Sequence, residues 1–184
     1  MQQEESKQKA LLIIDMQEGL TRRNTTHNSK NVIANISTLI KVARSSQCAV
    51  IFVQHDGDEG EPLHPSEPGW LIDSRLQPEI GDRIFRKTSP DSFWGTTLDE
   101  FLRTRGISEL FVTGMRTEVC VDTTCRRAVS LNYMVTLVSD AHTTTQESAG
   151  LDAPSIISHH NATLDDLGNS HAWIRLATTR DVKF

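Results

Sequence analysis

Apolar residues in this chain gather in short continuous runs. The clearest are ALLII at residues 10–14, AVIFV at 49–53 and MVTLV at 134–138. Runs of this length, rich in β-branched residues, are typical of strands buried on both faces of a parallel sheet. Weaker segments of the same kind predict three more strands, at residues 82–86, 110–112 and 173–178.

The segments between these strands show helical spacing. Residues 31–45 carry apolar side chains every three or four positions, which predicts a helix with one apolar face. Further helices are expected over residues 97–105, 118–131 and 149–161. Residues 19–28 are polar and predict a loop. Residues 55–80 are rich in glycine and proline, and a loop of that length in a compact domain is usually functional or mobile.

This alternation of strands and helices predicts one α/β domain over residues 10–184, preceded by a flexible tail at residues 1–9. The expected architecture is a doubly wound, mainly parallel six-stranded sheet in the order 3-2-1-4-5-6, with helices on both faces. In this order the first and fourth strands are neighbours. Ligands bind such sheets at the carboxyl ends of the strands, so the residues that follow each strand are the first candidates for a site.

The composition narrows the class of protein. The chain has 184 residues, of which 37% are hydrophobic and 23% are charged, and a net charge of −5. No run of Lys and Arg suggests a nucleic-acid partner, and no apolar run is long enough to span a membrane. The N-terminal residues lack the apolar core of a signal peptide. The three cysteines form no CxxC pair, so we expect neither a disulfide nor a zinc framework, and a cytoplasmic location.

One cysteine stands where a nucleophile could be activated. The run at residues 110–112 is broken by Gly114, and Thr117 then occupies the position of a helix N-cap. Cys120 would lie in the first helical turn, where unpaired N–H groups and the helix dipole favour a thiolate. The alternative is that Cys120 is a small, inert core residue.

Two charged residues are predicted to converge on this cysteine. Asp15 follows the first strand, next to the fourth strand that leads to Cys120, and Lys87 follows the third strand. Outside such a cluster, Asp15 is equally compatible with a turn or cap residue, and Lys87 with a surface charge.

Three segments together resemble the isochorismatase-like cysteine hydrolase superfamily, which includes nicotinamidases and N-carbamoylsarcosine amidohydrolase. They are LLIIDMQ at residues 11–17, KTSPDSFWGTTLDEFL at 87–102 and VTGMRTEVCVDTTCRRA at 112–128. The resemblance implies that Asp15, Lys87 and Cys120 form the catalytic triad. It also implies a cis peptide between Met115 and Arg116, and an oxyanion hole made by the backbone N–H groups of Arg116 and Cys120.

The function implied by this resemblance is a cysteine-dependent hydrolase. It would cleave the C–N bond of a small amide, ureido or lactam-like substrate through a thioester intermediate. Two alternatives stay open: an isochorismatase-type vinyl-ether hydrolase, which needs no nucleophile, and a non-catalytic relative that binds a metabolite. Relatives are commonly dimers or tetramers, so a homo-oligomer is expected.

The chain departs from the nicotinamidases after the second strand. Those enzymes carry an Asp-x-His metal motif there, whereas residues 54–57 read QHDG, so no metal and no other cofactor is expected. Several residues are candidates for the wall of the substrate pocket, and those that are large or apolar are equally compatible with the core. The candidates are Gln17, Leu20, His55, Trp70, Ser92, Phe93 and Trp94.

Overall fold

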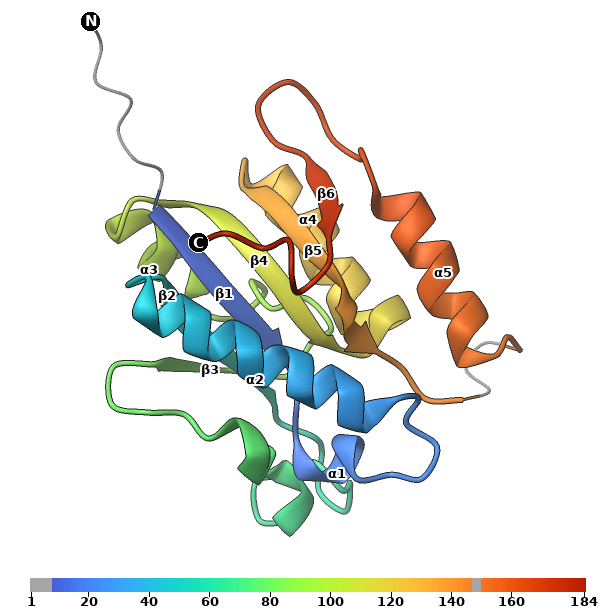
Figure 1. Cartoon of the computed structure of the whole chain (residues 1–184). Coiled ribbons are helices and arrows are strands. Elements are labelled where there is room, and N and C mark those ends of the chain that lie inside the picture. The colour runs from blue at the N-terminus through green and yellow to red at the C-terminus, as the bar shows by residue number, and fades with distance from the viewer. Residues whose placement is uncertain (1–7, 147–149) are drawn as a thin grey trace, which may run out of the picture.

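Six parallel strands form a single sheet in the computed structural model, which describes residues 8–146 and 150–184 (Figure 1). All five neighbouring pairs of strands are parallel. This arrangement confirms the predicted fold class and strand order. Across the sheet the strands are β3 (Arg83–Lys87), β2 (Ala49–His55), β1 (Gln8–Ile14), β4 (Ile107–Met115), β5 (Met134–Thr143) and β6 (Ile174–Ala177).

Helices cover both faces of this sheet. On one face lies α2 (Ser29–Ser45), and the other face carries α3 (Leu98–Thr104), α4 (Asp122–Ser130) and α5 (Ala153–Leu164). The side chains of β1 alternate between the two resulting cores, and every residue from Ala10 to Ile14 is fully buried. Burial on both faces explains why this strand is a continuous apolar run in the sequence.

Several boundaries differ from the sequence-based expectation. β1 begins at Gln8, so the last two residues of the expected tail belong to the sheet, while residues 1–7 lie outside the described part of the chain. The segment expected to be a loop at 19–28 begins with the short helix α1 (Glu18–Thr21). The long irregular segment at 55–80 contains two 3-10 turns, Pro68–Trp70 and Ser74–Leu76.

The last helix begins later than predicted. Residue 149 lies outside the described residues, and α5 starts at Ala153, where the Asp152 carboxylate accepts a hydrogen bond from the Ser155 N–H at 2.8 Å. Pro154 lies in the first turn, where its missing N–H has no helical partner to lose. The capping carboxylate therefore sets the start of this helix.

Strand β4 runs through the glycine that was expected to break it. Gly114 pairs with Ile14 of β1, and its φ of +115° is one that side chains rarely allow. A Cβ atom at this position would lie 2.1 Å from the backbone oxygen of Ile14. The glycine thus lets β4 continue to Met115 in close contact with β1, although its pairing with β5 shifts register between Val112 and Gly114.

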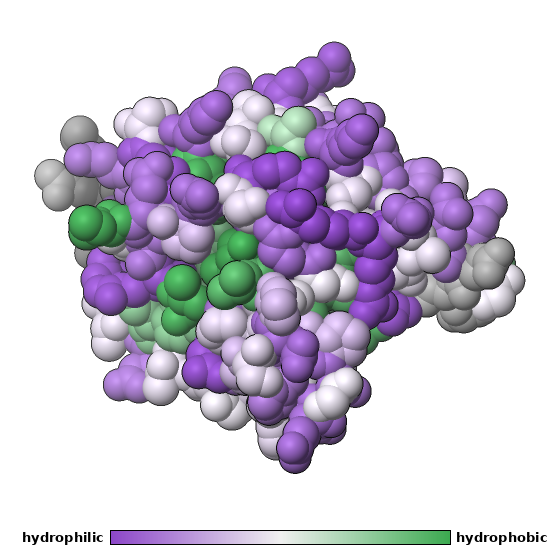
Figure 2. Space-filling view, turned by 90° about the horizontal axis from the view of Figure 1, so that it is seen from below, coloured by the Kyte–Doolittle hydropathy of each residue, from purple (hydrophilic) through white to green (hydrophobic). Residues whose placement is uncertain are grey.

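The carboxyl ends of the strands point to the lower side of Figure 1, and Figure 2 looks onto that side. Hydrophobic side chains gather there within a mainly hydrophilic surface. Within the described ranges 8–146 and 150–184, no helix is long and apolar enough to cross a membrane.

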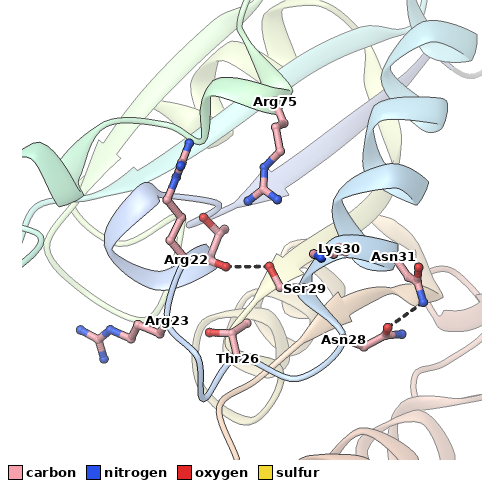
Figure 3. A pocket seen from close by; sticks show the side chains of 9 residues that line it. Arg22, Arg23, Thr26, Asn28, Ser29, Lys30, Asn31 and Arg75 are labelled. Atoms are coloured by element: carbon pink, nitrogen blue, oxygen red, sulfur yellow. Dashed lines mark hydrogen bonds between the residues drawn. The ribbon is translucent and has the colours of Figure 1, made fainter.

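A separate cavity of about 750 Å³ lies between α1, the start of α2 and the Ser74–Leu76 turn (Figure 3). Four cationic side chains line it, and two of them are paired: Arg22 with Glu18, and Arg75 with Asp73. The other two cations in its lining are Arg23 and Lys30. Arg23 points away from the rest of the lining in Figure 3, so the cations do not converge on one point.

Substitution of Gly114 tests the close approach of β4 to β1. We expect Gly114→Ala to lower the free energy of unfolding by about 3 kcal/mol or more, because the new Cβ clashes with the Ile14 carbonyl and the backbone conformation is unfavourable. Gly106→Ala is the matched control: Gly106 also has a positive φ, +64°, but has open space around it, so only about 1 kcal/mol should be lost. Urea unfolding measures both, and equal losses would contradict this explanation.

Candidate active site

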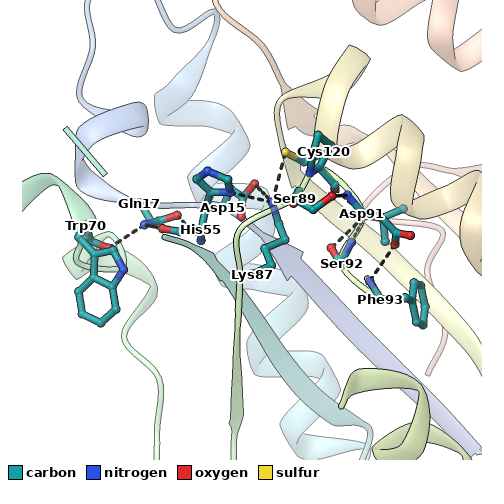
Figure 4. A network of polar contacts seen from close by, with 12 residues as sticks. Asp15, Gln17, His55, Trp70, Lys87, Ser89, Asp91, Ser92, Phe93 and Cys120 are labelled. Atoms are coloured by element: carbon teal, nitrogen blue, oxygen red, sulfur yellow. Dashed lines mark hydrogen bonds and ion pairs between the residues drawn. The ribbon is translucent and has the colours of Figure 1, made fainter. Parts of the chain in front are cut away.

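Three strand ends bring Asp15, Lys87 and Cys120 together (Figure 4). Asp15 follows β1, Lys87 is the last residue of β3, and Cys120 lies in the π-helical turn Thr117–Val121 that follows β4. Because β1 lies between β2 and β4, Lys87 reaches across the end of β2 to meet the other two. None of the three lines the cavity of Figure 3.

The ammonium group of Lys87 is the centre of this cluster. Its Nζ lies 2.7 Å from Oδ2 of Asp15 and 3.3 Å from Sγ of Cys120. It also donates to the backbone oxygen of Ser89 at 3.0 Å and lies 3.4 Å from Nδ1 of His55. The Lys87 side chain is 0% exposed and that of Asp15 only 2%, so this is a buried ion pair.

The environment keeps Lys87 charged. Burial by itself lowers the pKa of a lysine, but the negative charge of Asp15 and the hydrogen bonds to Asp15 and Cys120 outweigh burial. The net result is a pKa raised above the ordinary value. Lys87 is therefore a fixed cation at neutral pH.

Cys120 is held as a thiol in the absence of substrate. Burial and the nearby Asp15 carboxylate raise its pKa to about 12, and the opposing effect of Lys87 is too small to reverse this. The expected thiolate at a helix terminus is thus corrected. The α-helix begins only at Asp122, and Cys120 occupies the preceding π-helical turn, so the charges of Asp15 and Lys87 dominate its surroundings.

Asp15 adopts an unusual backbone conformation. Its φ is +51°, in the left-handed region that residues other than glycine rarely adopt, and its N–H donates to the Val53 oxygen at 2.9 Å. Its Oδ1 atom is buried and accepts no hydrogen bond that meets normal geometry from the described residues. Such a conformation persists only where the surroundings enforce it, and it is common at functional sites.

The turn that bears Cys120 has the expected cis peptide between Met115 and Arg116. Thr117, however, is not a helix N-cap. Its hydroxyl lies 2.9 Å from Nδ1 of His142 instead of bonding to a backbone N–H of the helix. The oxyanion hole expected from Arg116 and Cys120 stays a prediction.

Two of the seven candidate pocket residues come within hydrogen-bonding distance of the cluster. Nδ1 of His55 lies 3.4 Å from Nζ of Lys87, and the backbone N–H of Gln17 donates to the backbone oxygen of Asp15 at 2.8 Å. Burial and the charge of Lys87 lower the pKa of His55, so its ring is neutral at pH 7. Gln17 is completely buried and bonds to the backbone of His55 and Trp70, so it fastens the long loop to β2. The Trp70 indole donates to Asp56 at 2.8 Å.

The other four candidates lie in different environments. Leu20 and Phe93 belong to the two cores, and Phe93 stacks on Tyr133 with ring centroids 5.8 Å apart. Ser92 is buried and lies 2.9 Å from the Thr124 hydroxyl. These three side chains are buried, whereas Trp94 is 64% exposed, and a place for the four in the pocket wall stays a prediction.

Sequence reasoning missed two features of this site. One is the backbone oxygen of Ser89, which no side-chain pattern could indicate. The other is His142, a buried residue near the end of β5, which extends five residues beyond its predicted end at position 138. A histidine within a longer strand is visible in the sequence, but its partners come from distant segments. Among the described residues, no three His, Cys, Asp or Glu side chains are grouped as metal ligands would be.

Comparisons with known proteins identify the family of this chain. The family model for the isochorismatase domain matches residues 9–163. An uncharacterized isochorismatase family protein, YrdC of Bacillus subtilis, is 33% identical over 172 residues, covering 90% of each chain. Ureidoacrylate amidohydrolase RutB of Variovorax paradoxus is 31% identical over 72% of this chain and 67% of its own length. Streptothricin hydrolase of Streptomyces noursei is 33% identical over 73% of this chain, which spans 54% of that protein.

Solved structures show the same fold. An isochorismatase of Pseudomonas putida superposes with a TM-score of 0.86 at 28% identity, covering 95% of this chain and 90% of that one. N-carbamoylsarcosine amidase of Thermoplasma acidophilum superposes with a TM-score of 0.76 at 21% identity, covering 96% and 99%. With the family model matching most of the sequence, this chain belongs to the isochorismatase family of hydrolases.

Proposed function

We propose that this protein hydrolyses a C–N bond of a small amide, ureido or lactam-like molecule through a thioester on Cys120. The contact set of Lys87 carries the proposal, because one buried cation touches both a carboxylate at 2.7 Å and a thiol at 3.3 Å. An acid–base group and a nucleophile held by one cation are the parts that covalent amide hydrolysis needs. The name of the RutB relative, a ureidoacrylate amidohydrolase, supports the substrate class.

In the proposed first step, Asp15 accepts the thiol proton of Cys120 as Sγ attacks the substrate carbonyl. The negative charge then moves from the carboxylate toward sulfur while Lys87 stays protonated beside both. No net charge is created in the buried site, so the free-energy cost of this proton transfer stays small in a medium of low polarity. The raised pKa of Cys120 fits this order, because the thiol loses its proton only when the substrate is in place.

The tetrahedral intermediate then collapses. We assign its oxyanion to the backbone N–H groups of Arg116, which precedes the Thr117–Val121 turn, and of Cys120 within it. Loss of one such donor typically slows a reaction by about 10²–10³-fold. Asp15 returns its proton to the departing nitrogen, which leaves as an amine or ammonia, and the acyl group stays on sulfur.

Water completes the cycle. Asp15, again a carboxylate, takes a proton from a water molecule that attacks the thioester, and the carboxylic acid leaves as the thiol re-forms. His55 lies beside Lys87 with Nδ1 facing the ammonium. Its neutral ring therefore presents the N–H of Nε2, which we assign to contacts with the substrate.

Two other functions remain distinguishable from this one. Vinyl-ether hydrolysis needs Asp15 but no nucleophile, and a metabolite-binding protein needs neither. The thiol beside the ion pair favours the covalent route, because a hydroxyl or methyl group would fill the same space under either alternative.

Removal of the nucleophile tests the reaction class. We expect Cys120→Ala to reduce turnover by at least about a thousandfold and Cys120→Ser to reduce it strongly, with the folded state retained. Cys48→Ala is the control, since Cys48 is a half-buried thiol outside the cluster. Amide and ureide panels, followed by intact-protein mass spectrometry, would locate an acyl adduct on Cys120. Full turnover by Cys120→Ala would instead favour ether hydrolysis. If the unmodified protein turned over none of the compounds, a binding role would be favoured.

Removal of the carboxylate should change reactivity and turnover in opposite directions. Asp15 raises the pKa of Cys120 and Lys87 lowers it, so Asp15→Asn lowers that pKa and increases the thiolate fraction at neutral pH. We expect faster alkylation by iodoacetamide at pH 7–8 together with loss of turnover, because the proton acceptor is gone. Asp122→Asn, two residues beyond Cys120, is the control and should change neither the alkylation rate nor turnover. Slower alkylation of Asp15→Asn would show that the carboxylate does not hold the proton on sulfur.

A further inference from the structure

Behind the turn that bears Cys120, three polar side chains form a chain of hydrogen bonds, buried at Thr117 and His142 and half-buried at Asn161. Oγ1 of Thr117 lies 2.9 Å from Nδ1 of His142, and Nε2 of His142 lies 2.9 Å from Oδ1 of Asn161. Thr117 begins the π-helical turn, His142 lies near the end of β5, and Asn161 lies on α5. Three separate elements are therefore joined through one imidazole ring.

The direction of each hydrogen bond follows from the side chains themselves. The Asn161 amide nitrogen lies 3.5 Å from the Ser139 oxygen, so its Oδ1 faces His142 and accepts from the N–H at Nε2. Burial lowers the pKa of His142 to about 4, so the ring is neutral and Nδ1 carries no proton. Nδ1 is thus the acceptor for the Thr117 hydroxyl, and each nitrogen of the imidazole ring has one defined partner.

We infer that His142 and Asn161 are positioning residues that hold the Cys120 turn in place through the hydroxyl of Thr117. This inference rests on the proposed function, in which that turn and the preceding Arg116 supply the nucleophile and the oxyanion donors. His142 has no hydrogen bond to Asp15, Lys87 or Cys120 among the described residues, so it acts through Thr117.

An anchor to other elements adds to the turn's own backbone hydrogen bonds, which join residues close together in the chain: the Asp122 N–H, for example, donates to the Thr117 oxygen. The N–H groups of Val119 and Val121 both donate to the Arg116 oxygen, at 3.1 Å each. A single π-helical turn lacks the repeated ladder that stiffens an α-helix. Groups that stabilise a transition state must be held within about 0.5 Å of their working positions, so a connection to β5 and α5 has a direct chemical use.

The hydrogen bond to His142 also explains the threonine at position 117. A threonine three residues before the cysteine suggested a helix cap, yet its hydroxyl points to β5. A cap would have satisfied the start of a helix and nothing else. The bond to His142 instead couples the turn to a strand that lies next to β4 in the sheet.

Hydrogen exchange tests the anchor without any substrate. In the full-length protein, Thr117→Val removes the hydroxyl at constant shape and leaves the buried Nδ1 without a donor. We expect the amides of residues 117–121 to exchange about tenfold faster, with exchange in β1 unchanged. Thr117→Ser keeps the hydroxyl and should restore the slow exchange. Asn161→Ala, at the half-exposed end of the chain of bonds, should accelerate exchange in the same segment and serves if Thr117→Val fails to fold.

Thr163→Ala is the matched control, since Thr163 is an exposed residue of α5 whose hydroxyl, among the residues that the structure describes, bonds to His159 of the same helix. Once a substrate is in hand, Thr117→Val and Asn161→Ala should lower kcat with little change in KM. Lower thermal stability with unchanged exchange at 117–121 would overturn the inference, because it would show a purely structural role. Faster exchange with no covalent adduct on Cys120 would uphold the anchor and reject the proposed function instead.

Discussion

The ammonium group of Lys87 is removed from water, and the arrangement of the site follows from the need to compensate its charge. A buried cation without a partner would cost several kcal/mol, so a carboxylate must lie against it. Asp15 fills this role at 2.7 Å, and the Ser89 carbonyl accepts another of the three ammonium protons. The third proton lies between the thiol of Cys120 at 3.3 Å and Nδ1 of His55 at 3.4 Å. The left-handed backbone of Asp15 is part of the same requirement, because it holds the carboxylate at the end of β1.

The sheet supplies the framework for that contact. Lys87 comes from the edge strand β3 and must cross the end of β2, whereas Cys120 comes from the other side of β1. Gly114 brings β4 so close to β1 that no side chain fits between them, and the turn begins directly beyond. His142 and Asn161 then connect this turn to β5 and α5. Two separate sets of contacts therefore hold the cluster, one at the strand ends and one behind the turn.

Strand order and the meeting of Asp15, Lys87 and Cys120 could be predicted because they follow from local patterns and one topological rule. Apolar runs marked the strands, and the doubly wound order placed their ends together. Details that depend on distant partners could not be predicted. Gly114 read as a strand break because the neighbouring Ile14 backbone is invisible in the sequence. Thr117 read as a cap because its true acceptor lies 25 residues away in the chain. The charge state of Cys120 was misjudged for the same reason, since it depends on the burial and spacing of its neighbours.

All three thiols of this protein are held in the protonated form: burial raises the pKa of Cys48 and Cys120 to about 12, and that of Cys125 as well. Peroxides and disulfides react with thiolates rather than thiols, so protonated cysteines are oxidised more slowly in the absence of substrate. For Cys120 the protection comes partly from Asp15, the residue that would later accept its proton. In the proposed mechanism the same carboxylate thus has two effects: it keeps Cys120 a thiol in the absence of substrate, and it takes the proton when the substrate is bound.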